Sequence, residues 1–210
     1  MRETLTVLFI LYCSFVLAQS ETKLVLSGDY SKQDSVEIVQ AFVIAQNAIE
    51  AMYEAFDEVW TVFPKKNKKE RRFANWQQDE HLMKWLGEPD KIRMVRRRIR
   101  RIYNKSQKKV LLKVSDYGKG NCQTWVSAYT WPYGKVKIVL CPNYLKYRKH
   151  LRSKTIVHEL AHEAGMLFDK HIQGCWWARR AAASSSNFAK GRPENYAWLA
   201  VSYLGQDCGE

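Results

Sequence analysis

Apolar residues recur with a helical period along the first half of the chain. Over residues 35–62 they come close to every 3.6 positions, and the run ends at Phe63-Pro64. Residues 70–87 and 90–105 show the same period, each with its apolar positions on one face, and a Gly-Glu-Pro-Asp sequence separates them. The pattern therefore predicts three amphipathic helices, the first of them long.

The period changes at Val110. The segments "VLLKV", "QTWVSAYTW" and "GKVKIVLCP" are short and rich in β-branched and aromatic residues, with glycine and proline between them. They predict a small sheet of two or three strands. A helix is expected again from about Ser153, and a last one from about Asn195 to Leu204. We predict a helix-rich α+β fold, with residues 19–210 in a single domain.

The first residues have the form of a secretory leader. An apolar run from Leu5 to Leu17 follows Arg2 and ends in the small residue Ala18, so we expect a signal peptide over residues 1–18 and a secreted, extracellular protein. The run is too short for a helix that spans a bilayer with ordinary flanks.

The cysteines indicate disulfides. Of the five, Cys13 lies in the leader and four remain, an even number in a chain expected in an oxidising compartment. Sequence alone permits three pairings. We favour Cys122 with Cys141, which flank the predicted hairpin, and Cys175 with Cys208, which bracket the C-terminal segment.

The chain is strongly basic, with a formal net charge of +13. Much of this charge lies in "KKNKKERR", "RMVRRRIRR" and "KSQKK", which fall on the second and third predicted helices and their flanks. Such a face suits acidic glycans or a membrane surface, and it is equally typical of a solvated helix. The leader disfavours a nucleic-acid partner.

The segment His158-Glu159-x-x-His162 carries the candidate chemistry. On a helix, residues four apart share a face, so His158 and His162 can present two imidazole nitrogens to one Zn²⁺ ion. Glu159 then lies where it can take a proton from a zinc-bound water. The alternative is a helix that carries two histidines and no metal.

A third ligand is expected after Gly165, which is placed to end the helix. Asp169 and His171 both qualify chemically. The metzincin family would need a histidine at position 168, where this chain has Phe168.

Several motifs together resemble those of the aspzincins, the family of deuterolysin and peptidyl-Lys metalloendopeptidases. They are "LCPNY" at 140–144, "TIVHELAH" at 155–162 and "PENYAWLA" at 193–200. The resemblance implies a zincin-like fold and makes Asp169 the third zinc ligand, with His171 as the alternative. Gln173 stands where the family has a tyrosine, and His171 would replace that tyrosine as a donor to the oxyanion.

The resemblance also gives Glu194 a role. It lies where lysine-specific members of the family carry an acidic residue in the pocket for the substrate's lysine, so we predict that it binds substrate. The alternative is an acid in the first turn of the last helix, directly after Pro193.

Taken together, these features predict a secreted zinc endopeptidase that acts on proteins or peptides as a monomer. Its general base would be Glu159, and its cleavage sites would have lysine nearby. The alternative, from another class, is a decayed protease scaffold that binds acidic partners through its basic face.

Overall fold

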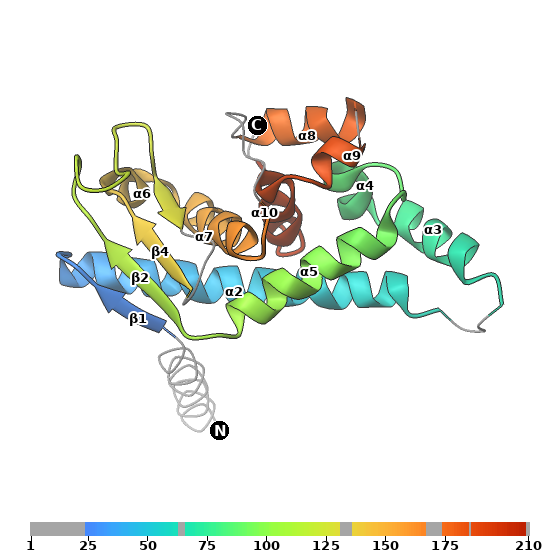
Figure 1. Ribbon diagram of the computed structural model, residues 1–210, viewed down its shortest axis with the longest axis horizontal. Helices are drawn as coiled ribbons and strands as arrows, with labels where there is room; N and C mark the ends of the chain where they lie inside the picture. The colour runs from blue at the N-terminus through green and yellow to red at the C-terminus, as the bar shows by residue number, and fades with distance from the viewer. Residues whose placement is uncertain (1–23, 63–65, 131–135, 167–173, 185, 209–210) are drawn as a thin grey trace, which may run out of the picture.

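The computed structural model describes residues 24–62, 66–130, 136–166, 174–184 and 186–208 (Figure 1). Helices dominate, and four strands form one sheet. In chain order the elements are β1 (Leu24–Ser27), α2 (Lys32–Trp60), α3 (Lys68–Gln78), α4 (Glu80–Leu86), α5 (Ile92–Ser106), β2 (Val110–Val114), β3 (Ala128–Thr130), β4 (Lys137–Leu140), α6 (Pro142–Lys146), α7 (Lys149–Glu163), α8 (Cys175–Ser184), α9 (Ser186–Ala189) and α10 (Pro193–Ser202).

The sheet has the strand order β1-β2-β4-β3. Strands β1, β2 and β4 run parallel, with Leu24 opposite Val110 and Leu112 opposite Ile138. Strand β3 runs antiparallel to β4 and forms one edge. The fold is thus the predicted helix-rich α+β arrangement, with one strand more than expected. The additional strand, β1, has only four residues, too few for a clear alternating pattern.

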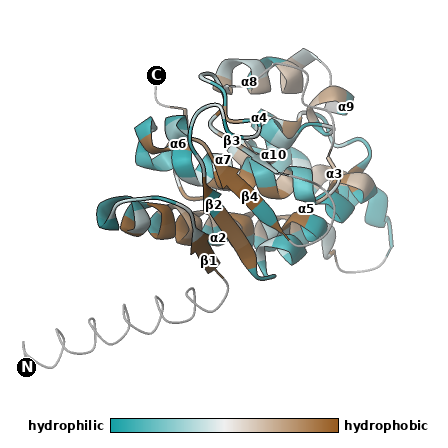
Figure 2. Cartoon of the chain, turned by 60° about the vertical axis from the view of Figure 1, so that its left-hand side comes forward, coloured by the Kyte–Doolittle hydropathy of each residue, from teal (hydrophilic) through white to brown (hydrophobic). Residues whose placement is uncertain are grey.

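Helix α2 provides the long buried face of the core. It begins earlier than predicted because Ser31 and Asp34 form a capping box, in which each side chain accepts a hydrogen bond from the other residue's backbone N–H. Its apolar face is buried along the whole length, and in Figure 2 the helix alternates between hydrophobic and hydrophilic colours. None of the described helices combines the length and apolar character needed to cross a membrane.

The helix predicted over residues 70–87 is two helices. Asp79 ends α3, and its side chain accepts the backbone N–H of Leu82 at 2.9 Å, which caps the start of α4. An aspartate that caps a helix competes with continuation of the preceding one, so the apolar period runs on while the backbone turns. Helices α6, α8 and α9 were not predicted.

Helices α7 and α10 lie at the centre of the molecule. Helix α7 packs against α2, α5 and α10 and also contacts β3 and β4. Figure 1 shows it between the sheet and α10. Every residue of α10 is buried. A helix that is buried on all sides needs no polar face, so the apolar residues of α10 show a less clear helical period than those of α2 and α5.

Both expected disulfides are present, Cys122–Cys141 and Cys175–Cys208. The first joins the loop before β3 to the residue that follows β4, so it closes the segment that leads into the edge strand. The second joins the start of α8 to the segment after α10.

Replacing Cys122 and Cys141 together with alanine should lower the free energy of unfolding by about 3 kcal/mol, because the bridge closes a loop with a sequence separation of 19. Urea denaturation of the oxidised wild type and the double variant measures this difference. Equal stabilities would show that this bridge does not restrain the unfolded chain.

Candidate metal and catalytic site

Helix α7 holds the three residues of the zinc motif. His158 and Glu159 are almost fully buried, and His162 is half-buried near the end of the helix. The imidazoles of His158 and His162 converge, with their Nε2 atoms 3.2 Å apart. Zinc with four tetrahedral ligands at about 2.0–2.1 Å places two of its nitrogen ligands about 3.3 Å apart. The spacing of the two rings therefore fits zinc.

The other nitrogen of each ring lies against an oxygen. Nδ1 of His158 is 2.9 Å from a carboxylate oxygen of Glu194, and Nδ1 of His162 is 2.8 Å from the carbonyl oxygen of Met166. Both contacts assign the proton of the neutral ring to Nδ1, so each Nε2 carries a lone pair. Two lone pairs at 3.2 Å repel each other unless a cation neutralises them. The hydrogen bonds thus prepare both rings for a metal.

Gly165 explains how the carbonyl of Met166 reaches His162. The helix ends in a Schellman motif, in which the N–H of Gly165 donates to the carbonyl of His162 and the N–H of Met166 to that of Ala161. Gly165 has φ 89°, in the left-handed region that favours glycine. The predicted helix-ending role of Gly165 is confirmed, and the same turn supplies a hydrogen-bond acceptor for the second histidine.

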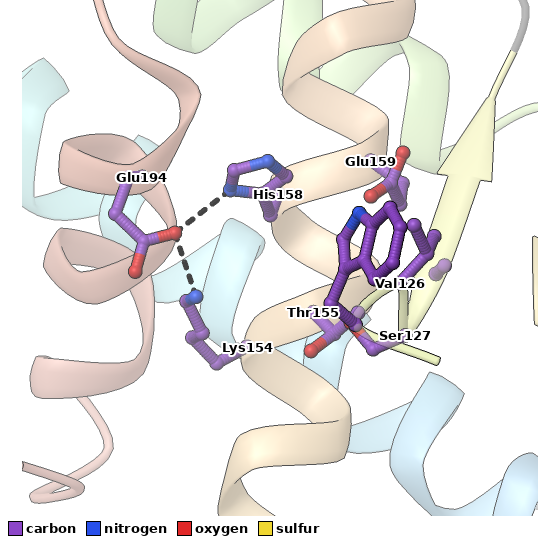
Figure 3. Close-up of a pocket in the computed structure, with 9 residues that line it drawn as sticks. Val126, Ser127, Lys154, Thr155, His158, Glu159 and Glu194 are labelled. Atoms are coloured by element: carbon purple, nitrogen blue, oxygen red, sulfur yellow. Dashed lines mark hydrogen bonds and ion pairs between the residues drawn. The ribbon is translucent and has the colours of Figure 1, made fainter. Parts of the chain in front are cut away.

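A cavity of about 420 Å³ opens beside His158 and Glu159. The loop before β3 and the start of this strand form one wall, and the N-terminal end of α10 contributes Glu194 (Figure 3). Trp125 lines the cavity and is 75% exposed. In Figure 3 the carboxylate of Glu159 lies on the side of α7 that faces the strand, whereas His158 points toward Glu194. A peptide in the cavity would therefore lie within reach of Glu159.

Glu194 lies in the first turn of α10 and is only 1% exposed. Besides His158, it accepts hydrogen bonds from Lys154 at 2.6 Å, from the backbone N–H of Gly174 at 2.9 Å and from the indole of Trp198 at 2.9 Å. Burial alone would raise the pKa of Glu194, but the charge of Lys154 and the hydrogen bonds from His158 and Lys154 outweigh it and hold the pKa well below its usual range. Glu194 is therefore a carboxylate at neutral pH.

The structure brings together some of the predicted site residues. His158, Glu159, His162 and Glu194 share one site, and Glu194 lines the cavity; its predicted role in binding substrate stays a prediction. Asp169 and His171 lie outside the described residues.

Lys154 was not predicted as a site residue, although its spacing from His158 could have indicated it. It precedes His158 by one helical turn, so it had to share its face of α7.

The comparisons with known proteins agree with this geometry. Residues 71–199 match the aspzincin family model, described as lysine-specific metallo-endopeptidase, and this match covers more than half of the chain. The chain belongs to the aspzincin family. This makes it a member of a metallopeptidase family, as the resemblance predicted.

The aspzincin fold is also found among solved structures. A zinc peptidase from Grifola frondosa superposes with a TM-score of 0.62 at 15% sequence identity, over 85% of this chain and 100% of the other. At this identity the likeness shows the fold alone. No curated protein matches the sequence significantly.

Zinc should bind with a stoichiometry near one per chain, and His158→Ala or His162→Ala should bring it close to zero, because each replacement removes a ligand from the converging pair. Elemental analysis after dialysis against a weak chelator measures the stoichiometry. His150→Ala is the matched control, since His150 is on the same helix about two turns before the motif. Full zinc content in both motif variants would contradict the assignment.

Proposed function

We propose that this chain is a secreted zinc endopeptidase that cleaves peptide bonds within proteins. The observation that carries the proposal is the convergence of the two Nε2 atoms, each ring fixed through its Nδ1, directly beside a buried glutamate that faces a cavity. Membership of the aspzincin family supports the same activity. The two disulfides support secretion, because such bonds persist in oxidising compartments.

In this proposal His158 and His162 hold the zinc, together with a third ligand for which Asp169 remains the prediction and His171 the alternative. When bound, zinc polarises the substrate carbonyl and lowers the pKa of water. Glu159 accepts a proton from the attacking water and passes it to the nitrogen of the leaving amine. The role of His171 as an oxyanion donor also stays a prediction.

The cavity walls suggest how a substrate would lie. The edge strand β3 is paired only with β4 among the described strands, and residues just before and at its start line the cavity. An extended peptide can add to such an edge through backbone hydrogen bonds, which would carry its carbonyl past Glu159. A preference for lysine through Glu194 is not part of this proposal, because four groups of the chain already donate to that carboxylate.

Glu159→Gln should lower kcat/KM for an unstructured protein such as casein by roughly 100- to 10,000-fold, because the amide cannot accept the proton of the attacking water. Its zinc content should stay near one per chain, since Glu159 is not a ligand. The matched control is Glu163→Gln, which changes a buried glutamate on the same helix that pairs with Lys105 and Thr130 instead. Wild-type protein with bound zinc and no cleavage would contradict the proposal and favour a decayed scaffold.

The exposed face of α5 favours a second, additional function, the binding of acidic glycans. Helix α5 contains no acidic residue, and its apolar face is buried in the core. Its exposed cations follow one another along the solvent side: Arg93, Arg97, Arg100 and Arg101. A row of guanidinium groups suits a linear sulfated chain, which can bind several of them in sequence. A membrane is less suitable, because α5 has no exposed apolar side chains to insert.

The triple variant Arg97→Gln, Arg100→Gln, Arg101→Gln should elute from a heparin column at lower salt than the wild type, because it loses adjacent cations on one face. The control variant Lys32→Gln, Lys113→Gln, Lys149→Gln removes the same charge from exposed positions elsewhere. Equal shifts in both variants would mean that net charge, not the α5 face, governs retention. Binding to anionic vesicles with the same dependence on α5 would favour a membrane partner.

A further inference from the structure

We propose that Glu194 is a positioning residue for the zinc ligand His158, and that Lys154 holds the place at this carboxylate that a substrate lysine would need. The inference rests on the proposed zinc site and deepens it. It assigns Glu194 an internal role, and it predicts that the cavity does not select lysine.

One oxygen of Glu194, Oε2, accepts hydrogen bonds from two residues of α7. Nδ1 of His158 donates to it at 2.9 Å and Nζ of Lys154 at 2.6 Å, as the dashed lines in Figure 3 show. His158 and Lys154 are one helical turn apart, so both reach the same oxygen from the same face of α7. Glu194 is thus bonded to two turns of the helix that carries the zinc ligands.

The other oxygen, Oε1, is held by groups outside α7. The indole N–H of Trp198, one turn further along α10, donates to it at 2.9 Å, and so does the backbone N–H of Gly174. Gly174 is the first described residue after the segment that contains Asp169 and His171. Glu194 therefore connects the first histidine of the site to the residue that follows the segment in which the third ligand is predicted.

These contacts decide how His158 presents its ring. A carboxylate that accepts Nδ1–H keeps the proton on that nitrogen, turns Nε2 toward the metal and makes it a better donor of electrons. The carboxylate can do this only if it cannot rotate away, and its donors on both oxygens prevent that rotation.

The same contacts leave a substrate lysine without a partner. The charges of Lys154 and Glu194 compensate each other, and Glu194 is 1% exposed although it lines the cavity. An incoming ammonium group would have to displace Lys154 from a charge-assisted hydrogen bond inside the protein, at an unfavourable desolvation cost. Lysine should therefore gain little at this position over an uncharged side chain of similar length.

The positioning role predicts that Glu194→Gln lowers zinc affinity by about 10- to 100-fold. Each carboxylate oxygen of Glu194 accepts two hydrogen bonds, and in glutamine one of these oxygens is replaced by an NH₂ group, which cannot accept them. Competition with a chromophoric chelator measures the affinity without relying on activity. Glu163→Gln serves as the control and should retain wild-type affinity, since Glu163 is equally buried but bonded to Lys105 and Thr130. Thermal unfolding of the metal-free proteins verifies that the variants are folded.

A milder variant keeps the test decisive if Glu194→Gln does not fold. Trp198→Phe retains an aromatic side chain but removes the indole N–H that donates to Oε1, and it should lower zinc affinity in the same direction by a smaller factor. Wild-type affinity in folded Glu194→Gln, or in Trp198→Phe where Glu194→Gln is unfolded, would overturn the positioning role. A wild type that binds no zinc would instead overturn the proposed function, so the two failures are distinguishable.

The specificity half is tested with peptides that differ only by lysine or methionine beside the scissile bond. The wild-type ratio of kcat/KM values should stay within about tenfold. In Lys154→Met the ratio should shift toward lysine by about tenfold or more, because Glu194 then lacks its internal cation. A wild-type preference for lysine of about 100-fold, or no shift in Lys154→Met, would overturn this half of the inference.

Discussion

The proposed metal site depends on one constraint, which is that the imidazoles of His158 and His162 in α7 must turn their Nε2 atoms toward the same point. A helix places two residues four apart on one face, but it leaves their rings free to rotate about χ1 and χ2. Here an oxygen behind each ring removes that freedom, the carboxylate of Glu194 for His158 and the carbonyl of Met166 for His162. The two acceptors come from different parts of the structure, so the proposed metal site requires that α7, its C-terminal turn and α10 are all in place.

This requirement explains why α7 and α10 form the centre of the fold. Among the described elements they make the most extensive contact of any pair, and α2, α5 and the sheet also pack against α7. Close packing leaves α10 little room to shift along α7, which keeps Glu194 level with His158. The cavity then lies where the packing is interrupted, between the start of β3 and the first turn of α10. Stability and site geometry thus come from the same contacts.

The features that could be predicted from the sequence are those that depend on residues close together along the chain. The amphipathic helices α2 and α5 and the strands β2 and β4 have clear local periods, and the zinc motif is itself local because a single helix presents both histidines. The break at Asp79 and the strand β1 were missed, since a cap overrides an apolar period and four residues show too little of one. Both disulfides were paired as found, because each pair brackets one segment.

The role of Glu194 could not be predicted from the sequence. The family resemblance placed it at the site, but its partners His158 and Lys154 are 36 and 40 residues away, and only the packing of α10 on α7 brings them together. A carboxylate in that position can bind a cation of the substrate or accept hydrogen bonds from the protein itself. Which of the two it does depends on the donors that the fold places around it. Composition and spacing do not contain that information.

Two ion pairs with buried carboxylates join α7 to its neighbouring helices α5 and α10. Glu194 pairs with Lys154, and Glu163 pairs with Lys105 while it also accepts the hydroxyl of Thr130 in β3. A buried ion pair seldom stabilises a fold more than apolar residues of the same volume would, so stability alone does not account for two of them. The Glu194 pair fixes the orientation of the proposed zinc ligand His158, whereas the Glu163 pair joins α7 to α5 and does not line the cavity. The Glu194 pair thereby favours one arrangement of α7 and α10 over slightly displaced ones, which a site requires when small displacements matter to its chemistry.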